Sequence, residues 1–355
     1  MSIAFYPVKI KNIEALTPLS KKFVLEIPLE QRSLFKDWIA GQNVSVRVYL
    51  EDQKISRPYS IVDFDGEHLF LVVKQVQNGV ASHHIHNNFQ VDQTIEITAP
   101  KGKYLYTPED HENLILFATG SGITPIYAMI SKALAKNPNQ NIRLFYGNSD
   151  PNETIFYSEL KNLAEKYSNF KVYFFFSQVE KKQRISPASV KNLSESLLFQ
   201  GTKYYLCGVP AMMENIRSFL IENNVKAEQI FQESFIKIAN PVSTSKPENL
   251  EQNNIEKKSK VEVIIDKIKT NFELEYELNT FPEEKNILQT ANALGADLPY
   301  SCLEGICCTC RAKLIEGKVE MKNNLALDVE EEKQGYILCC QSYPRSEKVV
   351  ISFDL

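Results

Sequence analysis

The first hundred residues alternate apolar and polar positions. Segments such as "NVSVRVYL" (43–50) and "HLFLVVKQVQ" (68–77) carry apolar side chains at nearly every second position, and turns are expected at "FDGE" and "PKGK". A period of two with frequent turns is typical of strands that bury one face. We therefore predict an antiparallel barrel or sandwich over residues 1–108.

From residue 109 the alternation gives way to short apolar runs separated by helix-compatible sequence. The runs are "NLILFATG", "NIRLFYG", "KVYFFFS" and "KYYLCG", and the first is followed by the amphipathic stretch "PIYAMISKALAK". Short buried strands that alternate with helices are typical of a parallel sheet. The pattern predicts an α/β domain over residues 109–236.

The apolar pattern disappears after residue 236 and returns near residue 260. Residues 237–259 are rich in Asn, Ser, Pro, Glu and Lys, a composition that predicts a flexible linker. Beyond it, "VEVIID" and "FELEYEL" are expected to be paired strands, "NILQTANALGA" a helix ending near Gly295, and "KVVISF" a closing strand. Residues 260–355 are thus expected to form a small α+β domain.

Length and composition narrow the possible classes of protein. A chain of 355 residues exceeds one comfortable core, which indicates two or three domains. A net charge of −4 argues against nucleic-acid binding as the main task. The first residues, "MSIAFYPVKIKNIEAL", lack the features of a signal peptide, and no apolar run is long enough to span a bilayer. We expect a cytoplasmic protein without a membrane partner.

Charge is distributed unevenly. Residues 260–355 hold 11 Lys/Arg against 17 Asp/Glu, a net of −6, so the rest of the chain carries +2. An acidic domain has either a solvated face or a docking surface for a basic partner, and both interpretations remain open.

Six of the seven cysteines lie after residue 300. Cys302, Cys307 and Cys310 have the C-x4-C-x2-C spacing of plant-type [2Fe–2S] sites, with Cys339 or Cys340 available as the fourth ligand. A structural zinc site more often has two paired CxxC knuckles. A dithiol redox motif needs only Cys307 and Cys310 and leaves Cys302 unexplained. The spacing therefore favours [2Fe–2S].

The segment "SRPYSIVD" carries residue types suited to a flavin. Arg57 offers a planar fork of donors for a phosphate, Tyr59 is an aromatic plate and Ser60 a small hydroxyl. A surface strand with an ion-paired arginine is the alternative at this point.

Two further segments suit phosphate groups. In "NGVASHHIHNN", Gly79 precedes an expected helix with Ser82 as its N-cap, a natural site for a pyrophosphate. Its histidines (His83, His84 and His86) have no nearby carboxylate or cysteine, and helix-face histidines are the better interpretation of them. In "LILFATGSGITPIYAMI", Gly120 to Pro125 lie between a strand and a helix, although not in the G-x-G-x-x-G pattern.

Together these segments resemble the ferredoxin–NADP reductase superfamily. They correspond to R-x-Y-S at 57–60, G-x-x-S at 79–82, a "GTGIAP"-like segment at 120–125, and C-G-x-x-x-M at 207–212. The stretches "LPYSCLEGICCTCRAKLIEGKV" and "GYILCCQSYP" resemble the cluster-binding region of plant-type ferredoxins. The resemblance covers nearly the whole chain except the linker. It implies an antiparallel β-barrel FAD domain, an α/β parallel-sheet NAD(P) domain and an α+β β-grasp ferredoxin domain.

The resemblance also implies roles for individual residues. The residues expected to bind FAD are Arg57, Pro58, Tyr59, Ser60, Gly79, Val80, Ala81 and Ser82. Those expected at the nicotinamide are Gly120, Thr124, Pro125, Gly208 and Met212, with Phe235 closing over the flavin. Ser60, Cys207 and Glu233 are expected around the reacting atoms, although Cys207 alone would also pass for a buried core cysteine. The family's last cluster ligand directly precedes Gln, which selects Cys340 and leaves Cys308 and Cys339 as loop-packing residues.

The order flavin, nicotinamide, ferredoxin is similar to that of reductase components of bacterial multicomponent oxygenases, most closely the phenylacetyl-CoA epoxidase type. This implies that NAD(P)H reduces FAD and that single electrons pass through [2Fe–2S] to an oxygenase or hydroxylase. Some relatives carry FMN, but the G-x-x-S element and the length of the flavin half favour FAD. A fatty-acid desaturase or haem monooxygenase is the alternative acceptor, and an iron–sulfur redox sensor is the alternative of a different class.

The choice between NADH and NADPH depends on the segment "GNSDPNET". Asp150 suits a ribose 2′-hydroxyl and repels a 2′-phosphate, and no base is adjacent, which favours NADH. Lys181, Lys182 and Arg184 lie further along the chain and leave NADPH open.

Overall fold

The protein divides into two compact units, each with its own core. The computed structural model describes residues 4–50, 54–76, 79–108, 113–180, 182–193, 201–235, 257–265, 267–276, 281, 286–296, 298–300, 305, 309–324, 327 and 329–354. One unit comprises Phe5–Leu50 and Ile55–Ile236, and the other comprises chiefly Lys237–Leu355. The first unit holds both the expected flavin half and the expected nicotinamide half.

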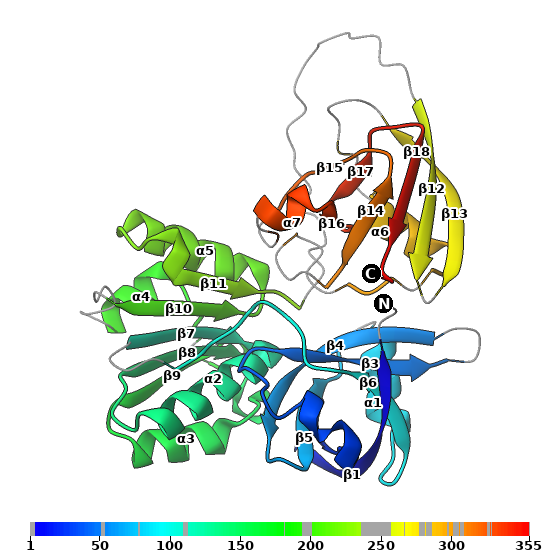
Figure 1. Ribbon diagram of the computed structural model, residues 1–355. Helices are drawn as coiled ribbons and strands as arrows, with labels where there is room; N and C mark the ends of the chain where they lie inside the picture. Colours follow the sequence, from blue (N-terminus) through cyan, green and yellow to red (C-terminus); the bar gives the residue numbers. More distant parts are fainter. Residues whose placement is uncertain are drawn as a thin grey trace. The chain divides into compact units, whose positions relative to one another are not determined.

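The flavin half is a closed antiparallel barrel in the order β1-β2-β5-β4-β3-β6 (Figure 1). Its strands are β1 (Phe5–Thr17), β2 (Ser20–Glu26), β3 (Asn43–Tyr49), β4 (Lys54–Phe64), β5 (His68–Lys74) and β6 (Thr94–Thr98). Alternate side chains such as Ile10, Leu25 and Ile97 are fully buried, as the period of two predicts. Helix α1 (Val80–Asn88) packs beside β5. The barrel, and not the sandwich, is therefore the correct alternative.

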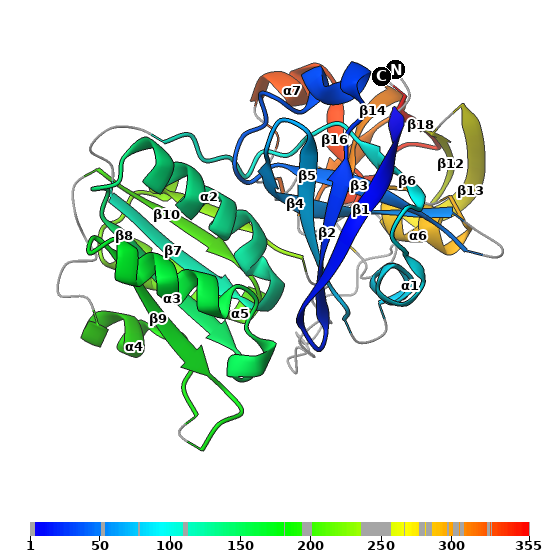
Figure 2. The same ribbon diagram turned by 90° about the horizontal axis from the view of Figure 1, so that it is seen from below.

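The nicotinamide half is a parallel sheet in the order β11-β10-β7-β8-β9. Its strands are β7 (Asn113–Thr119), β8 (Ile142–Asn148), β9 (Phe170–Phe176), β10 (Thr202–Cys207) and β11 (Ile230–Glu233). Helices α2 (Ile123–Lys136) and α3 (Tyr157–Lys166) cover one face, and α4 (Pro187–Leu193) and α5 (Pro210–Glu222) cover the other (Figures 1 and 2). The predicted apolar runs are confirmed as parallel strands.

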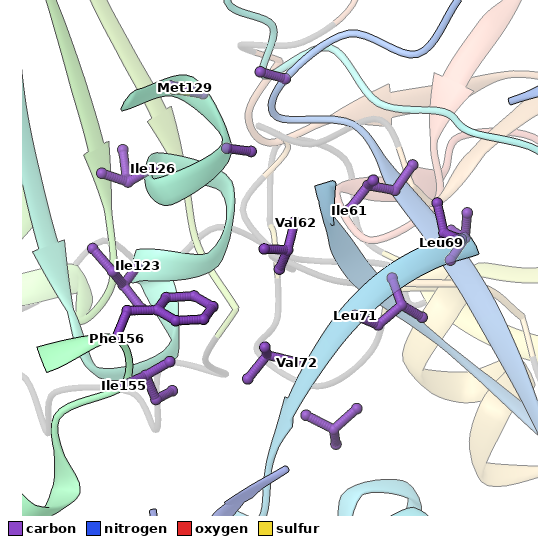
Figure 3. Close-up of a cluster of buried hydrophobic side chains, with 14 of the residues drawn as sticks. Ile61, Val62, Leu69, Leu71, Val72, Ile123, Ile126, Met129, Ile155 and Phe156 are labelled. Atoms are coloured by element: carbon purple, nitrogen blue, oxygen red, sulfur yellow. The ribbon is translucent and has the colours of Figure 1, made fainter. Parts of the chain in front are cut away.

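The barrel and the parallel sheet share one hydrophobic core. Figure 3 shows the Phe156 ring, next to α3, on the side that faces Val62 and Val72 of the barrel. The labelled side chains come from β4 and β5 on one side and from α2 and the segment before α3 on the other: Ile61, Val62, Leu69, Leu71, Val72, Ile123, Ile126, Met129, Ile155 and Phe156. All ten of these side chains are buried, so the two halves pack directly against each other there.

Polar contacts join the same two halves. Lys132 of α2 places its Nζ 3.6 Å from the Asp63 carboxylate and 4.7 Å from the centre of the Trp38 ring. The Tyr205 hydroxyl of β10 donates to the carbonyl of Leu105 at 2.9 Å. These contacts therefore add polar links between the barrel half and the sheet half.

The second unit contains a mixed sheet in the order β13-β12-β18-β14-β16 and a short ladder of β15 with β17. The bounds are β12 (Lys257–Ile265), β13 (Ile268–Tyr276), α6 (Ile287–Ala293), β14 (Arg311–Glu316), β15 (Val319–Met321), α7 (Val329–Lys333), β16 (Tyr336–Leu338), β17 (Ser342–Pro344) and β18 (Lys348–Ser352). Helix α6 buries Ile287, Leu288 and Ala291 against the sheet. The paired strands, the helix and the closing strand are confirmed, in the arrangement of a β-grasp domain.

Strand β12 begins at Lys257, so the last residues of the expected linker belong to a strand. The rest of that segment, up to residue 256, lies outside the described residues. Within the described ranges, no helix has the length and apolar character needed to cross a membrane.

Candidate functional site

Neighbouring parallel strands bring three of the predicted motifs to one edge of the sheet. Cys207, the last residue of β10, pairs with Ala118 on β7 and with Glu233 at the end of β11. Because the carboxyl ends of parallel strands lie at the same edge, the glycine segment after β7, Cys207 and Glu233 lie side by side. Phe235, two residues beyond Glu233, packs against the shared core.

Glycines let the backbone segments at this edge come close together. A Cβ on Gly122 would lie 2.3 Å from the carbonyl oxygen of Cys207, and one on Gly208 would lie 1.9 Å from Thr119 Oγ1. Gly208 has a φ of +149°, which also favours glycine. The N–H of Val209 donates to Thr119 Oγ1 at 2.7 Å. No larger residue fits at either glycine without a backbone shift.

Helix α2 starts directly after this turn. Thr124, in its first turn, is buried and donates its hydroxyl to the carbonyl of Ser121 at 3.0 Å, and Pro125 follows it. Gly120 has a φ of +54°, and a Cβ there would meet nothing within 4 Å, so this position is open. An open glycine at the positive end of a helix suits a phosphate. Met212 is buried in the first turn of α5, which follows β10.

The Cys207 thiol and the Glu233 carboxyl group, at the ends of β10 and β11, are buried. Cys207 has no exposed surface, and Glu233 is 3% exposed. Burial, and then the nearby Glu233, raise the pKa of the Cys207 thiol well above its usual range. Cys207 therefore stays a neutral S–H group near neutral pH and is not a thiolate nucleophile.

The R-x-Y-S motif lies on β4. Ser60 is 3% exposed, and its hydroxyl finds no hydrogen-bond partner in the described part of the chain. Burial raises the pKa of the Tyr59 hydroxyl, while the nearby Arg57 charge lowers it. Arg57 Nη1 donates to the carbonyl of Ser56 at 2.7 Å. The neighbour of Ser60, Ile61, donates its N–H to the carbonyl of Gln42 at 2.9 Å.

The prediction of Ser82 as a helix N-cap is wrong. Helix α1 starts at Val80, with Gly79 at the N-cap, so Ala81 and Ser82 lie inside the first turn. The Ser82 hydroxyl donates to the carbonyl of Gly79 at 3.0 Å and accepts from the N–H of Val76 at 3.2 Å. The Ser82 side chain thus stabilises the turn before the helix from a position inside the first helical turn, and the N-cap position itself is taken by Gly79 in an extended conformation.

The histidines of α1 lie among amide side chains. A ring nitrogen of His83 lies 2.8 Å from Gln75 Nε2, and one of His84 lies 3.1 Å from Asn88 Nδ2. Burial, and then the Lys21 charge, lower the pKa of His86. Among the residues that the structure describes, no three His, Cys, Asp or Glu side chains gather as a metal-binding group.

Sequence reasoning missed Tyr104, which lies near Cys207 and Glu233. Tyr104 is 5% exposed, and burial, then Cys207 and then Glu233, raise the pKa of its hydroxyl well above the usual range. A tyrosine after the turn "PKGK" carries no chemical motif of its own, so only the tertiary structure reveals its neighbours.

Asp150 has a structural task. Its Oδ1 accepts from the N–H of Asn152 at 2.7 Å and of Glu153 at 3.2 Å, capping the turn after β8. The carboxylate expected from sequence to recognise a ribose is thus partly engaged by the backbone. Lys182 and Arg184 are exposed, and Lys181 lies outside the described residues.

Two predicted cluster ligands lie at one end of the ferredoxin sheet. Cys310 precedes β14 and Cys340 follows β16, and these strands pair through Arg311 and Leu338. Both cysteines are 2% exposed. Gln341 Nε2 lies 3.8 Å from Cys340 Sγ. The other predicted ligands, Cys302 and Cys307, and the bystander Cys308 lie outside the described residues.

Packing around Cys340 is tight. Gly305 has a φ of +76°, and a Cβ there would lie 2.7 Å from the carbonyl oxygen of Asn323 and 3.0 Å from Gln341 Cγ. Cys339 is fully buried and donates its N–H to the carbonyl of Cys310 at 3.1 Å. Gly305 of the predicted cluster loop thus packs against Gln341, the residue that follows Cys340.

These residues fit the expected cofactors. Several buried hydroxyls have no partner among the described residues, and two of them lie at the predicted sites, at Ser60 of the R-x-Y-S motif and at Ser234 beside Glu233. Such groups are unfavourable unless a ligand pairs with them. A flavin and a nicotinamide carry the carbonyl, amide and ring nitrogen atoms that would do so, and the glycine edge leaves room for a pyrophosphate.

Models of known domain families match the chain in three segments. Residues 7–106 match an oxidoreductase FAD-binding domain, residues 116–218 an oxidoreductase NAD-binding domain, and residues 274–345 a 2Fe-2S iron-sulfur cluster binding domain. The expected cofactors, FAD, NAD(P)H and [2Fe–2S], are confirmed at the level of these domains.

Curated relatives span nearly the same length. The chain is 29% identical over 364 residues to one of the subunits of 1,2-phenylacetyl-CoA epoxidase from Escherichia coli, covering 99% of this chain and 98% of the relative. It is 30% identical over 321 residues to the ferredoxin reductase component of 3-ketosteroid-9-alpha-monooxygenase from Mycobacterium tuberculosis, covering 88% and 85%.

A solved structure shows the same fold. Phthalate dioxygenase reductase superposes with a TM-score of 0.60 at 23% identity, covering 99% of this chain and 98% of that one. Both sequence and fold thus agree with the domain order inferred from the motifs. The chain belongs to the family of NAD(P)H-dependent flavoreductases that join FAD-binding, NAD-binding and 2Fe-2S domains and serve as reductase components of oxygenases.

Proposed function

We propose that this chain supplies electrons from NAD(P)H to an oxygenase of the phenylacetyl-CoA epoxidase type. One observation carries the electron-transfer site: Cys207 pairs with Ala118 and Glu233 at the open edge of a sheet that shares its core with the flavin barrel. Bound FAD takes two electrons from the reduced nicotinamide and releases them singly to a [2Fe–2S] cluster.

For the flavin, we assign the motif residues of β4 and α1. Arg57 supplies charge for a phosphate, Pro58 and Tyr59 a wall, and Ser60 a buried hydroxyl that pairs with the ring system. Gly79 is the N-cap of α1, and Val80, Ala81 and Ser82 of the first turn would offer backbone N–H groups to the pyrophosphate.

For the nucleotide, we assign the carboxyl edge of the parallel sheet. Gly120, in the turn before α2, and Thr124 and Pro125, in its first turn, would hold the pyrophosphate, while Gly208 and Met212 would border the nicotinamide. The Cys207 thiol and the Glu233 carboxylate orient the carboxamide and exclude water, because both are buried. Phe235, which packs against the shared core, would be a movable ring over the bound flavin.

For the cluster, we assign Cys302, Cys307, Cys310 and Cys340. The burial of Cys310 and Cys340 at one end of the β14–β16 pair supports the assignment, as does the amide of Gln341 beside Cys340 Sγ. Donors near the cluster sulfurs tune its reduction potential. Cys308 and Cys339 are assigned as packing residues.

The epoxidase assignment is supported by the relative from Escherichia coli, which matches from end to end. The experiment mixes purified holoprotein with the oxygenase component of a phenylacetyl-CoA epoxidase, phenylacetyl-CoA and NADH or NADPH. We expect nucleotide oxidation coupled to epoxide formation. Cytochrome c reduction without any epoxide would confine the proposal to the flavoreductase activity, and a 3-ketosteroid hydroxylase, a fatty-acid desaturase or a haem monooxygenase would be tested next as acceptor.

For the donor, we propose NADH. The Asp150 carboxylate is held by two backbone N–H groups at the end of β8, which keeps a negative charge where a 2′-phosphate would add another. Comparing kcat/KM for the two nucleotides tests this, and a preference for NADPH would direct attention to Lys182 and Arg184.

We further propose domains at 1–108, 109–236 and 260–355, with a linker at 237–259 whose last three residues are taken up by β12, which begins at Lys257. The family matches at 7–106, 116–218 and 274–345 support these boundaries. Limited proteolysis followed by mass spectrometry tests them, and a first cut inside one of the three ranges would contradict them.

A further inference from the structure

Tyr104 belongs to the segment that leaves the barrel, and its backbone is held from both sides. Lys101 and Asn43 exchange backbone hydrogen bonds at 2.8 and 2.9 Å, and the N–H of Tyr106 donates to the carbonyl of Ala40 at 2.9 Å. A Cβ on Gly41 would lie 1.7 Å from the carbonyl oxygen of Tyr104. Position 41 thus has room only for glycine, and the tyrosine backbone rests directly on the chain that follows Ala40.

An aromatic cluster holds the Tyr104 ring. Its centroid lies 5.5 Å from that of Tyr205 on β10, with the planes at 71°. Tyr205 also meets Tyr106 edge-on at 5.6 Å and stacks on Phe231 of β11 at 4.7 Å. The ring therefore lies over the face of β10 and β11 that carries Tyr205 and Phe231.

The same face carries Cys207 and Glu233. Cys207 lies two residues beyond Tyr205, and Glu233 lies two beyond Phe231, so all four side chains emerge on one side of the paired strands. Tyr104, packed against Tyr205, lies close enough to Cys207 and Glu233 for both to act on its hydroxyl electrostatically.

The three tyrosines of the cluster differ in their hydroxyl partners. Tyr205 donates to the carbonyl of Leu105 at 2.9 Å, and the Tyr106 hydroxyl accepts from Gln140 Nε2 at 3.0 Å. The Tyr104 hydroxyl is buried and has no hydrogen-bond partner in the described ranges. Packing alone does not explain why position 104 is a tyrosine, because phenylalanine would fill the same space without burying an unpaired polar atom.

We propose that Tyr104 is a positioning residue of the nicotinamide edge: with the nucleotide bound, its hydroxyl donates a hydrogen bond to the Glu233 carboxylate and holds it beside the Cys207 thiol. The inference rests on the roles proposed above for Cys207 and Glu233. Burial and the acidic neighbours Cys207, Glu233 and Tyr205 keep the phenol protonated, so it remains a donor.

The first experiment compares Tyr104→Phe with the wild type in the full-length holoprotein. Flavin reduction is followed by stopped-flow absorbance against nucleotide concentration. We expect a limiting rate about tenfold lower, as for the loss of one hydrogen bond to a charged group, with a half-saturating concentration within about twofold. A limiting rate equal to that of the wild type overturns the proposal.

Tyr106→Phe is the matched control, because it removes a paired hydroxyl from the same cluster. It should lower the stability of the protein and leave the limiting rate unchanged. Tyr104→Phe should show the reverse, a lower rate without loss of stability. An equal loss of rate in both variants would mean that the cluster acts only through packing, and would overturn the proposal.

The second experiment adds Glu233→Gln and the double variant. If Tyr104 acts through Glu233, the double variant reduces flavin no more slowly than Glu233→Gln alone. A further loss of about tenfold in the double variant overturns the inference while leaving the role of Glu233 in place. If Glu233→Gln reduces flavin at the wild-type rate, the role proposed for Glu233 fails, and this inference fails with it.

Discussion

The flavin and nicotinamide halves share one core, whereas the ferredoxin unit has a core of its own. Ile61, Val62 and Val72 of the barrel belong to the same buried cluster as Ile126 and Phe156 of the parallel-sheet half. The hydrophobic core of the ferredoxin unit instead consists only of residues of the second unit, from Val261 to Phe353.

This difference corresponds to two kinds of electron transfer. Passing a hydride requires two ring systems in contact, so the residues around them must be held within a fraction of an ångström. A common core provides such a fixed geometry without a domain closure. Single electrons do not require contact, so a ferredoxin module can keep a separate core and still take part.

The largest effect is expected from variants that lose the [2Fe–2S] cluster while the flavin and nicotinamide halves stay intact. Replacing Cys310 or Cys340 by Ser would remove a proposed thiolate ligand and should abolish or strongly alter the [2Fe–2S] absorbance and electron paramagnetic resonance signal, with nearly complete loss of acceptor reduction. Flavin reduction by NAD(P)H should persist at its normal rate, because the flavin barrel and the parallel sheet keep their own core.

Cys308→Ser and Cys339→Ser are the matched controls, and both should retain the cluster signal. Loss of the signal in Cys339→Ser with retention in Cys340→Ser would exchange the assignment of these two cysteines. Slower flavin reduction in Cys310→Ser would show that the two cores are energetically connected.

Phe156→Ala tests the shared core. Phe156 is 5% exposed and stacks on Tyr127 at 4.2 Å. Its loss should lower the free energy of unfolding of the first unit by about 3–5 kcal/mol. Denaturant titration followed by the fluorescence of Trp38, the single tryptophan of the chain, measures the change.

The companion variant is Phe353→Ala, in the ferredoxin core. It should shift the unfolding of the cluster absorbance and leave the Trp38 transition in place. Should either substitution move both transitions equally, the two units would unfold as one, and the contrast between them would be lost.

A smaller effect is expected from Ser60→Ala. The Ser60 hydroxyl is buried without a protein partner among the described residues, so its removal should cost little stability. Flavin reduction should slow about tenfold or more, because one polar contact to the cofactor is lost. Stopped-flow reduction and flavin content are measured together, and an unchanged rate with full flavin content contradicts the assignment of Ser60.

The smallest effect is expected from Lys132→Met. The Lys132 side chain is 39% exposed, so its contacts with Asp63 and Trp38 should contribute only about 0.5–1 kcal/mol. We expect a small fall in the stability of the first unit and a change in Trp38 emission, without a change in the cluster spectrum. Lys136→Met, at the end of the same helix, is the control. A loss above about 2 kcal/mol would mean that the lysine organises more of the interface than these two contacts.

Much of the fold could be predicted because apolar spacing reports burial directly. The runs that form β7 and β10 are continuous because helices cover both faces of their sheet, while β2 alternates because the barrel buries only one face. The motif residues Gly120, Cys207 and Glu233 could be grouped by resemblance, and strand register then places them together.

What could not be predicted depends on contacts distant in sequence. Tyr104 packs on Tyr205, on the face of the paired strands that also carries Glu233, only through the fold, and no local pattern marks it. The sequence predicts Ser82 as an N-cap because serine favours that position, but Gly79 starts the helix three residues earlier. The sequence also does not display that Asp150 caps a turn, because this use of its carboxylate depends on backbone geometry.

The strand order also bears on how the barrel and the ferredoxin sheet avoid unwanted association. A closed barrel offers no free strand edge, whereas the ferredoxin sheet, in the described part of the chain, ends on one side with β13. Its outward side chains include Lys269, Glu273 and Glu275, all exposed. Charges of this kind discourage a second chain from adding a strand. The barrel is protected from aggregation by its closure, whereas the ferredoxin sheet depends on side-chain charge, a protection that weakens as ionic strength rises.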